Sequence, residues 1–117
     1  MPSKNPSAAL TDILDNIVLA REFVAGLTFE EFKRDRKCVY AVVRCLEIIS
    51  EAVRRLPAEI EQRYPHLPWR NMRAAGNLYR HQYDDVSESI LWKTLDTGLT
   101  SLEDMARTEI QRGRSKI

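Results

Sequence analysis

The residues of this chain best suited to chemistry lie close together in its second half. Asn77 and His81 are four positions apart, so on a helix they would share a face, and Tyr83 follows just beyond. An imidazole can take or give a proton near neutral pH. An amide can orient a bound group, and a phenol can stack on a base or donate a hydrogen bond. Together these side chains could transfer protons at a phosphate ester.

Arginines and aromatic rings surround these residues. The stretch from Gln62 to Tyr83 has no acidic residue and a formal charge of +4, whereas the whole chain is +1. Cations bind phosphate and rings stack on bases, so the stretch indicates a surface for nucleotides or single-stranded RNA. The alternative is a solvated basic helix whose aromatic residues belong to the core. Its arginines, histidines and aromatic residues are Arg63, Arg70, Arg73, Arg80, His66, His81, Tyr64, Trp69, Tyr79 and Tyr83.

RNA cleavage without a metal ion needs few groups. A base takes the proton of a ribose 2′-hydroxyl or an acid protonates the leaving oxygen, and a cation stabilises the phosphoryl oxygens. His81 suits the proton transfer, and Asn77 can orient the scissile phosphate. The alternative is structural, because a lone histidine is more often a packing residue than a catalyst, and Tyr83 could likewise only pack.

Other kinds of site find no support in the sequence. There is no Gly-rich phosphate loop, no spacing of His and carboxylates typical of a metal site, and no Ser/His/Asp set. Cys38 and Cys45 would lie two helical turns apart, too far to bridge, so we expect reduced, buried thiols. We expect no cofactor or metal, and a cytoplasmic protein without signal peptide or membrane span.

Helical periodicity runs through almost the whole sequence and predicts one all-α domain over residues 1–117, with residues 1–6 and 114–117 frayed. The helix expected from about Arg36 to Leu56 is apolar on two adjoining faces. It should therefore be the most buried element, and a two-fold homodimer would cover what one subunit leaves open. Further helices are expected at Ala58 to Gln62 and Trp69 to His81. Local caps and breaks are expected at Thr28 with Glu31, Asp35, Asp85 with Glu88, Gly98, and Thr100 with Glu103.

Several blocks of the sequence resemble the HepT-like family of the HEPN superfamily. The most specific is LPWRNMRAAGNLYRHQYDDV, followed by ILW, and upstream come GLTFEEFKRDRKCVYAVVRCLEIISEAVRRLP and YPHLPWR in the family's order. The resemblance covers roughly residues 9 to 95. It implies a small HEPN-type helical bundle, a ribonuclease activity, and a toxin encoded beside a minimal nucleotidyltransferase antitoxin.

The family's active site is an Arg-(four to six residues)-His-x-Tyr motif. The resemblance implies that His81 and Tyr83 are its histidine and tyrosine, and that Asn77 is the polar residue following its arginine. The arginine itself should stand at position 76, where this chain has Gly76.

Another arginine would have to replace the missing one. Arg73 lies eight residues before His81, about 12 Å along a helix, and Arg80 adjoins His81. Either of these, or an arginine across a dimer axis, could contact the phosphate. Arg70 and Tyr79, with Arg73 and Arg80, are the expected RNA-binding residues.

The resemblance also implies a means of control. The partner nucleotidyltransferase would transfer AMP to Tyr83, adding bulk and negative charge that repel RNA.

Arg44 and Glu47, one helical turn apart in the long helix, have two interpretations. They form a surface ion pair, which is the role we favour, or they orient active-site residues.

The sequence thus predicts a HepT-like toxin, a metal-independent endoribonuclease acting through a His/Tyr motif. The alternative is a non-catalytic HEPN-type module that binds a nucleotide or the nucleotidyltransferase. Under the first, Asn77, His81 and Tyr83 should converge on one solvent-accessible cleft, with at least one arginine near His81.

Overall fold

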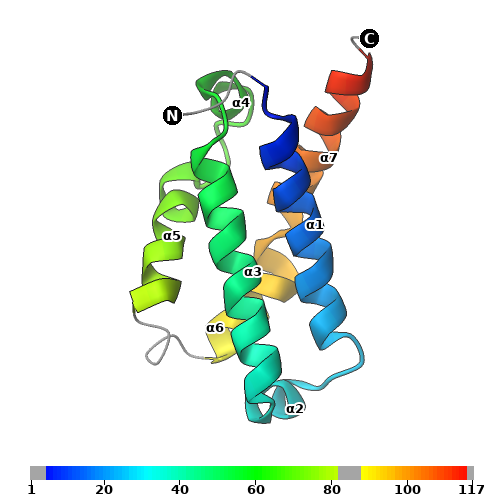
Figure 1. Cartoon of the computed structure of the whole chain (residues 1–117), viewed down its shortest axis with the longest axis vertical. Helices are drawn as coiled ribbons and strands as arrows, with labels where there is room; N and C mark the ends of the chain where they lie inside the picture. Colours follow the sequence, from blue (N-terminus) through cyan, green and yellow to red (C-terminus); the bar gives the residue numbers. More distant parts are fainter. Residues whose placement is uncertain (1–4, 82–87, 116–117) are drawn as a thin grey trace.

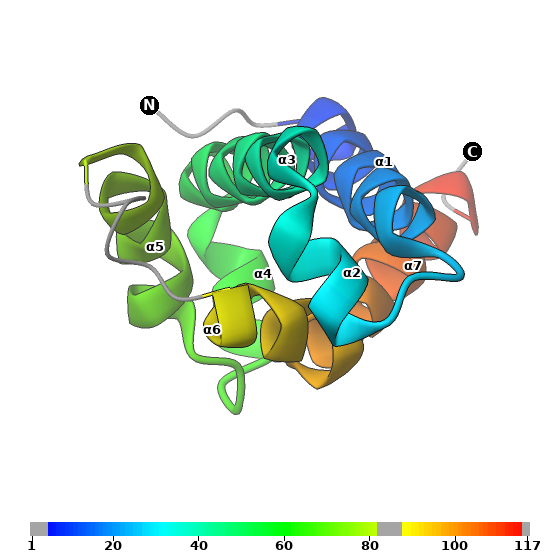
Figure 2. The same cartoon turned by 90° about the horizontal axis from the view of Figure 1, so that it is seen from below.

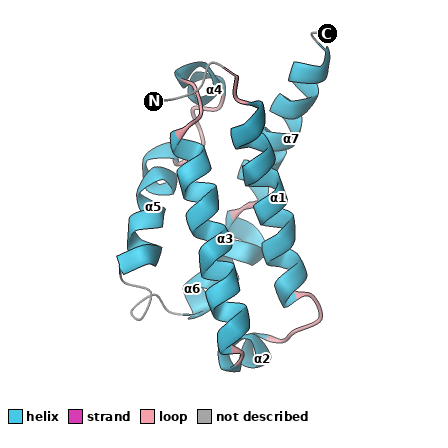
Figure 3. Cartoon of the chain, in the orientation of Figure 1, coloured by secondary structure: helices cyan, strands magenta, loops and turns pink. Residues whose placement is uncertain are grey.

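The computed structural model describes residues 5–81 and 88–115, and within these ranges helices joined by turns and loops are the only regular secondary structure (Figure 3). The all-α prediction is therefore confirmed. Four longer helices form the body of the molecule, and four short elements connect or cover them. The longer helices are α1 (Ser7–Val24), α3 (Arg36–Arg54), α5 (Trp69–His81) and α7 (Thr100–Ser115), and the short elements are α2 (Phe29–Arg34), α4 (Ala58–Arg63), α6 (Glu88–Lys93) and the π-helical turn η1 (Thr94–Gly98).

Helix α3 stands at the centre of the arrangement. It lies between α1 and α5, while α7 packs on another side of α1 (Figures 1 and 2). Both α1 and α5 run antiparallel to α3 (Figure 1). Nine residues of α3 are buried, against five of α1, which agrees with the expected prominence of the long helix.

Most of the two apolar faces of α3 is covered within the chain. Val42 and Ile49 of one face and Cys45 and Ala52 of the other are all buried. Val39, Ala41 and Ile48 of these faces are partly exposed, so α3 by itself neither requires nor excludes a partner subunit, and the homodimer stays a prediction. Among the described residues, the large apolar side chains that remain exposed are Tyr40 of α3 itself and, on other helices, Val18, Leu19, Phe23 and Ile90.

Most of the expected helix ends are formed by the residues that predicted them. Thr28 Oγ1 accepts from the Glu31 N–H at 3.1 Å, and a Glu31 carboxylate oxygen accepts from the Thr28 N–H at 2.9 Å. Asp35 caps α3 by accepting from the Cys38 N–H at 3.0 Å. Asp85 lies outside the described residues, so the cap it forms with Glu88 stays a prediction.

The capping box expected at Thr100 with Glu103 is not formed, although α7 does begin at Thr100. The Glu103 N–H donates to the Leu99 carbonyl at 2.8 Å, and the Glu103 carboxylate binds Arg21 and Arg107. A tertiary ion pair with α1 therefore takes the carboxylate that a local cap would have used. Gly98 ends the π-helical turn before α7, as its position led us to expect, and α7 continues through Ser115.

A cluster of charged and polar groups joins α4 to α7. The Glu109 carboxylate, 3% exposed, binds Arg63, accepts from the Tyr64 hydroxyl at 2.8 Å and lies 3.3 Å from Arg112 Nε. Burial opposes its charge, but the hydrogen bonds from Arg63 and Tyr64 outweigh burial and hold the pKa of Glu109 below its usual value. This cluster fixes the position of the connector that leads to α5.

Two further expectations concern the cysteines and the membrane. Cys38 and Cys45 are both buried and free, and burial raises the pKa of each thiol. The Cys38 thiol donates to the Phe23 carbonyl at 3.3 Å, so it links α3 to the end of α1. Among the described residues, no helix has the length and apolar character needed to cross a bilayer.

Candidate active site

Helix α5 carries most of the candidate site residues, and α3 holds it by its backbone. Ser50 Oγ donates to the Met72 carbonyl at 2.8 Å and lies 3.2 Å from that of Arg73. Arg54 Nε also donates to the Arg73 carbonyl, at 3.0 Å. Ser50 is buried, so these bonds are shielded from water and fix the register between the two helices.

The first turn of α5 is anchored by an aromatic residue. Trp69 is buried, and its indole N–H donates to the Tyr64 carbonyl at 2.8 Å. Tyr64 itself donates to Glu109. For these two rings the structural interpretation is therefore correct, because both serve the core and the connector.

The arginines of the basic stretch also divide into different roles. Arg63 binds Glu109, and Arg73 binds Glu61 across the gap between α4 and α5. Arg70 is exposed and has no hydrogen bond or ion pair with any residue that the structure describes. Arg73 would have to give up Glu61 to reach a phosphate, which weakens the case for it as the replacement cation.

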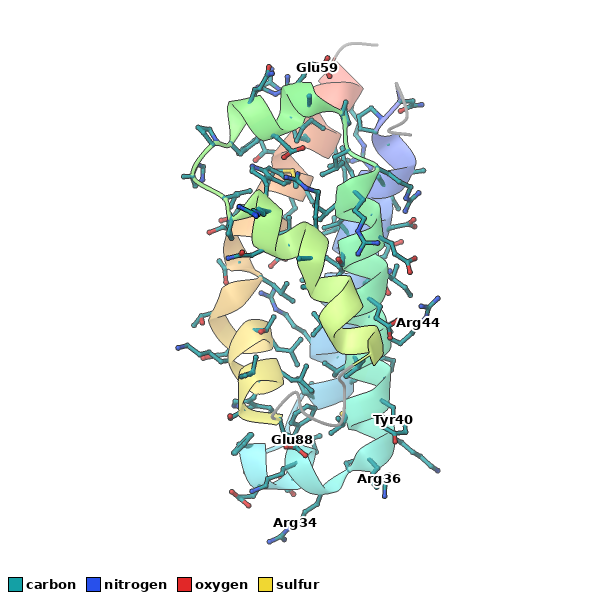
Figure 4. The ribbon with its side chains drawn as sticks, turned by 90° about the vertical axis from the view of Figure 1, so that its left-hand side faces the viewer. Arg34, Arg36, Tyr40, Arg44, Glu59 and Glu88 are labelled. Carbon is teal, nitrogen blue, oxygen red and sulfur yellow. The ribbon has the colours of Figure 1, made fainter. Side chains whose placement is uncertain are left out.

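The register of the two helices locates the end of α5 on α3. Because α5 runs antiparallel to α3 and Ser50 meets Arg73, each step forward on α5 matches a step back on α3. Gly76 therefore lies level with Glu47. His81, eight positions beyond Arg73, lies level with the stretch from Tyr40 to Arg44. Figure 4 shows Arg44 and Tyr40 on α3 beside the end of α5.

The remaining candidate residues lie at this end of α5 or just past it. The backbone of α5 continues through His81, so Asn77 and His81 stand one helical turn apart as predicted. The side chains of residues 76–81 and the whole of Tyr83 lie outside the described residues. Their convergence in one cleft therefore stays a prediction, as do the roles assigned to Asn77, Tyr79, Arg80, His81 and Tyr83.

The α3 surface beside this end of α5 is rich in arginine. Arg44 is 62% exposed, and its guanidinium lies 3.8 Å from the carboxylate of Glu47, which is 15% exposed. One turn earlier, Tyr40 is 49% exposed, and the guanidinium of Arg36 lies 5.9 Å from its ring centre. Sequence reasoning missed Arg36 and Tyr40 because it read α3 for its apolar faces. The spacing of Arg36, Tyr40 and Arg44 at intervals of four was the available signal.

A large groove among the described residues lies away from α5. It has a volume of about 890 Å³ and runs between α1 and α7, where Asp15, Arg107 and Arg112 line it. Within the described residues, no group of His, Cys, Asp and Glu side chains could hold a metal ion. Neither feature adds a residue to the candidate site on α5.

Comparison with known proteins settles the family. Residues 13–109 match the family described as ribonuclease HepT-like, a span that includes α3 and the whole of α5. This chain belongs to the HepT-like ribonuclease family. The match confirms the resemblance and the HEPN-type fold that it implied.

Individual relatives agree with this assignment. A "Putative RNase" of Methanocaldococcus jannaschii is 39% identical over 92 residues, which cover 79% of this chain and 76% of the relative. The "Probable ribonuclease HepT" of Thermococcus cleftensis is 38% identical over 94 residues, covering 80% and 86%. A "Putative RNase" of Caldanaerobacter subterraneus is 33% identical over 109 residues, covering 93% and 97%. No solved structure matches the chain.

Proposed function

We propose that this chain is the toxin of a toxin–antitoxin pair, an endoribonuclease that cleaves RNA without a metal ion. The observation that carries the proposal is the family match over residues 13–109, which spans the residues Asn77, His81 and Tyr83 of the motif. The exposed arginine and tyrosine of α3, level with the end of α5, support a polyanionic substrate.

The chemistry proposed for the site is transfer within the substrate. His81 takes the proton of a ribose 2′-hydroxyl, whose oxygen attacks the adjacent phosphorus. The bond to the 5′-oxygen of the next nucleotide breaks, and that oxygen takes a proton from water, while His81 returns its own proton to the solvent. A cyclic phosphate and a free 5′-hydroxyl are formed. Asn77 orients the phosphate, and a nearby cation stabilises the charge on its oxygens.

One observation favours a second candidate function. Gly76 stands where the family motif has arginine, and loss of that cation would leave a module that binds a nucleotide or the nucleotidyltransferase without cleaving RNA. A panel of single-stranded and structured RNAs, incubated with the protein in EDTA, separates the two. Cleavage that disappears in His81→Ala supports the nuclease. No cleavage of any RNA by the wild type contradicts it.

Control by an antitoxin belongs to the same proposal. The partner nucleotidyltransferase joins the Tyr83 hydroxyl to the α-phosphate of ATP and releases pyrophosphate, which leaves AMP on the toxin. The added negative charge repels RNA from the site. Incubation with the nucleotidyltransferase and ATP should add the mass of one AMP unit to the wild type but not to Tyr83→Phe. Equal modification of both proteins would contradict Tyr83 as the acceptor.

The proposed assembly is a homodimer, and the exposed apolar side chains of α1 offer a surface for it. Val18, Leu19 and Phe23 are 38%, 41% and 40% exposed, and all three lie in the second half of that helix. Sedimentation should show a dimer at micromolar concentration, and Leu19→Lys should weaken it. A monomer under these conditions contradicts the assembly without affecting the proposed chemistry.

A further inference from the structure

The feature that suggests an additional role is the position of the Arg44–Glu47 pair opposite Gly76. Ser50 contacts the Arg73 carbonyl, and both Gly76 and Glu47 lie three positions from that contact, one on each antiparallel helix. The pair therefore lies level with the turn of α5 where the family motif carries its arginine. Glycine has no side chain, so position 76 itself contributes no group there.

We propose that Arg44 is a catalytic residue, which supplies to the scissile phosphate the positive charge that Gly76 lacks. The inference rests on the proposed ribonuclease activity and adds the residue that stabilises the phosphoryl oxygens. In this proposal α3 supplies the positive charge and α5 supplies the histidine. The bonds from Ser50 and Arg54 to the α5 backbone fix the register between these two helices.

The other described arginines of α3, of its C-cap and of α5 are occupied or distant. Arg36, at the start of α3, donates to the Tyr40 hydroxyl at 3.4 Å and lies two helical turns before Arg44. Arg73 binds Glu61, Arg54 donates to the Arg73 carbonyl, and Arg55 binds Asp12 at 2.7 Å. Arg70 stands in the first turn of α5, eleven residues before His81 and about 16 Å from it along the axis. Arg54, Arg55, Arg70 and Arg73 all lie away from the level of the end of α5.

Arg44 has the properties that binding a phosphate requires. Its side chain is 62% exposed, and the 3.8 Å distance to Glu47 is longer than a hydrogen bond, so most donors of the guanidinium are not used by that carboxylate. A guanidinium offers a planar fork that fits two phosphate oxygens at once. Glu47 is only 15% exposed, so the carboxylate beside the guanidinium is largely shielded from water while the guanidinium itself is not.

The test is cleavage of a fluorescent single-stranded RNA in EDTA under single-turnover conditions. Arg44→Ala should slow the cleavage step by about a hundredfold to a thousandfold, the usual cost of removing one donor to a developing oxyanion. Arg44→Lys should retain part of the rate, because a lysine supplies charge without the fork. The salt dependence of RNA binding should also fall in Arg44→Ala, by about 0.7 in the logarithmic slope for each phosphate that the protein no longer neutralises.

The chain contains a closely matched control. Arg107 is 56% exposed and pairs with a carboxylate, Glu103, that is 16% exposed, but it lies on α7. Arg107→Ala should therefore cleave at the wild-type rate. Thermal unfolding of both alanine variants should match the wild type, because each loses an exposed side chain. If Arg44→Ala proves unstable, Arg44→Gln provides the same test.

A double substitution asks whether the charge or the position matters. Arg44→Ala with Gly76→Arg returns a guanidinium to the same level from the opposite helix, so it should recover at least part of the cleavage rate. An Arg44→Ala variant that cleaves at the wild-type rate would overturn the inference and leave the ribonuclease intact. An equal loss in Arg107→Ala would also overturn it, because the effect would then be one of net charge. A wild type that cleaves no RNA would instead overturn the proposed function itself.

Discussion

Two Arg–Glu pairs of this protein have the same spacing and very different surroundings. Glu109 and Arg112 on α7 are three positions apart, as are Arg44 and Glu47 on α3. Glu109 is 3% exposed and is also bound by Arg63 and Tyr64. Arg44 is 62% exposed, and its pair is the looser of the two.

The difference follows from what packs over each pair. At Glu109 the α4 connector closes over the carboxylate and supplies two further donors, so the charge is satisfied entirely within the fold. At Arg44 no comparable contact from another described element is formed, and the guanidinium is 62% exposed. An arginine beside a carboxylate is thus structural where another element covers it, and available to a ligand where none does.

The largest expected effect tests whether the surface at the end of α5, next to the exposed Arg44–Glu47 pair, is catalytic. His81→Ala should lower RNA cleavage by about a hundredfold to ten-thousandfold, because the proton transfer would lose its base. Cleavage assays should be run with Glu109→Gln as the control, at a temperature where that variant stays folded. Strong cleavage by His81→Ala would show that the surface at the end of α5 is not the catalytic site.

The reverse experiment tests the buried cluster around Glu109. Glu109→Gln should lower the free energy of unfolding by about 1–3 kcal/mol, because Arg63 loses its ion pair and the Tyr64 hydroxyl its charged acceptor. Urea denaturation measures this loss. The matched substitution in the exposed pair, Arg44→Ala, should change the free energy of unfolding by less than about 0.5 kcal/mol. Equal losses in the two variants would contradict the contrast drawn between the pairs.

Lowering the pH should lower the free energy of unfolding through the carboxylates of Glu109 and Glu103. The pKa of Glu109 is held low by Arg63 and Tyr64 against the effect of burial, and that of Glu103 is lowered chiefly by its hydrogen bond from Arg21. A carboxylate with a lowered pKa in the folded state stabilises the fold above its unfolded pKa, about 4.3. That stability is lost as the pH falls through the lower, folded pKa. Unfolding measured from pH 7 to pH 3 should show a smaller loss in Glu109→Gln than in the wild type.

The sequence predicted the fold well where local signals and burial agreed. Residues Trp69 to His81 were expected to form a helix and do so, and Thr28 with Glu31 forms the expected capping box. The Thr100 box failed because Glu103 has a stronger partner, Arg21, which is remote in sequence. A local pattern cannot reveal competition from another helix.

The candidate site was harder to predict for the same reason. The basic stretch looked like one surface, but Arg63 and Arg73 are paired with Glu109 and Glu61, and Trp69 is buried. The register that sets Glu47 level with Gly76, and Arg44 about one turn nearer the end of α5, depends on the contact of Ser50 with the α5 backbone. No spacing within either helix contains that information.

A smaller effect tests the attachment of α5 itself. Ser50→Ala removes a buried hydroxyl bonded to the α5 backbone and should cost about 1 kcal/mol in the free energy of unfolding. Cleavage should fall as well, because the register between His81 and Arg44 is less firmly held. The exposed Ser101→Ala on α7 is the control, and it should change neither quantity. Loss of stability with full cleavage would show that the bond does not position the site.

The smallest expected effect comes from restoring the motif arginine in the wild-type background. Gly76 lies inside α5, where replacing glycine by a good helix former should stabilise the chain by several tenths of a kcal/mol, up to about 1. If Arg44 already supplies the charge, Gly76→Arg should change cleavage by no more than a few fold, because the two guanidinium groups would compete for one phosphate and for Glu47. Cleavage rates and unfolding must be measured together, since added stability alone can raise the active fraction. A rise of about a hundredfold would mean that the wild type lacks a cation at the scissile phosphate, and that Arg44 does not supply one beside His81.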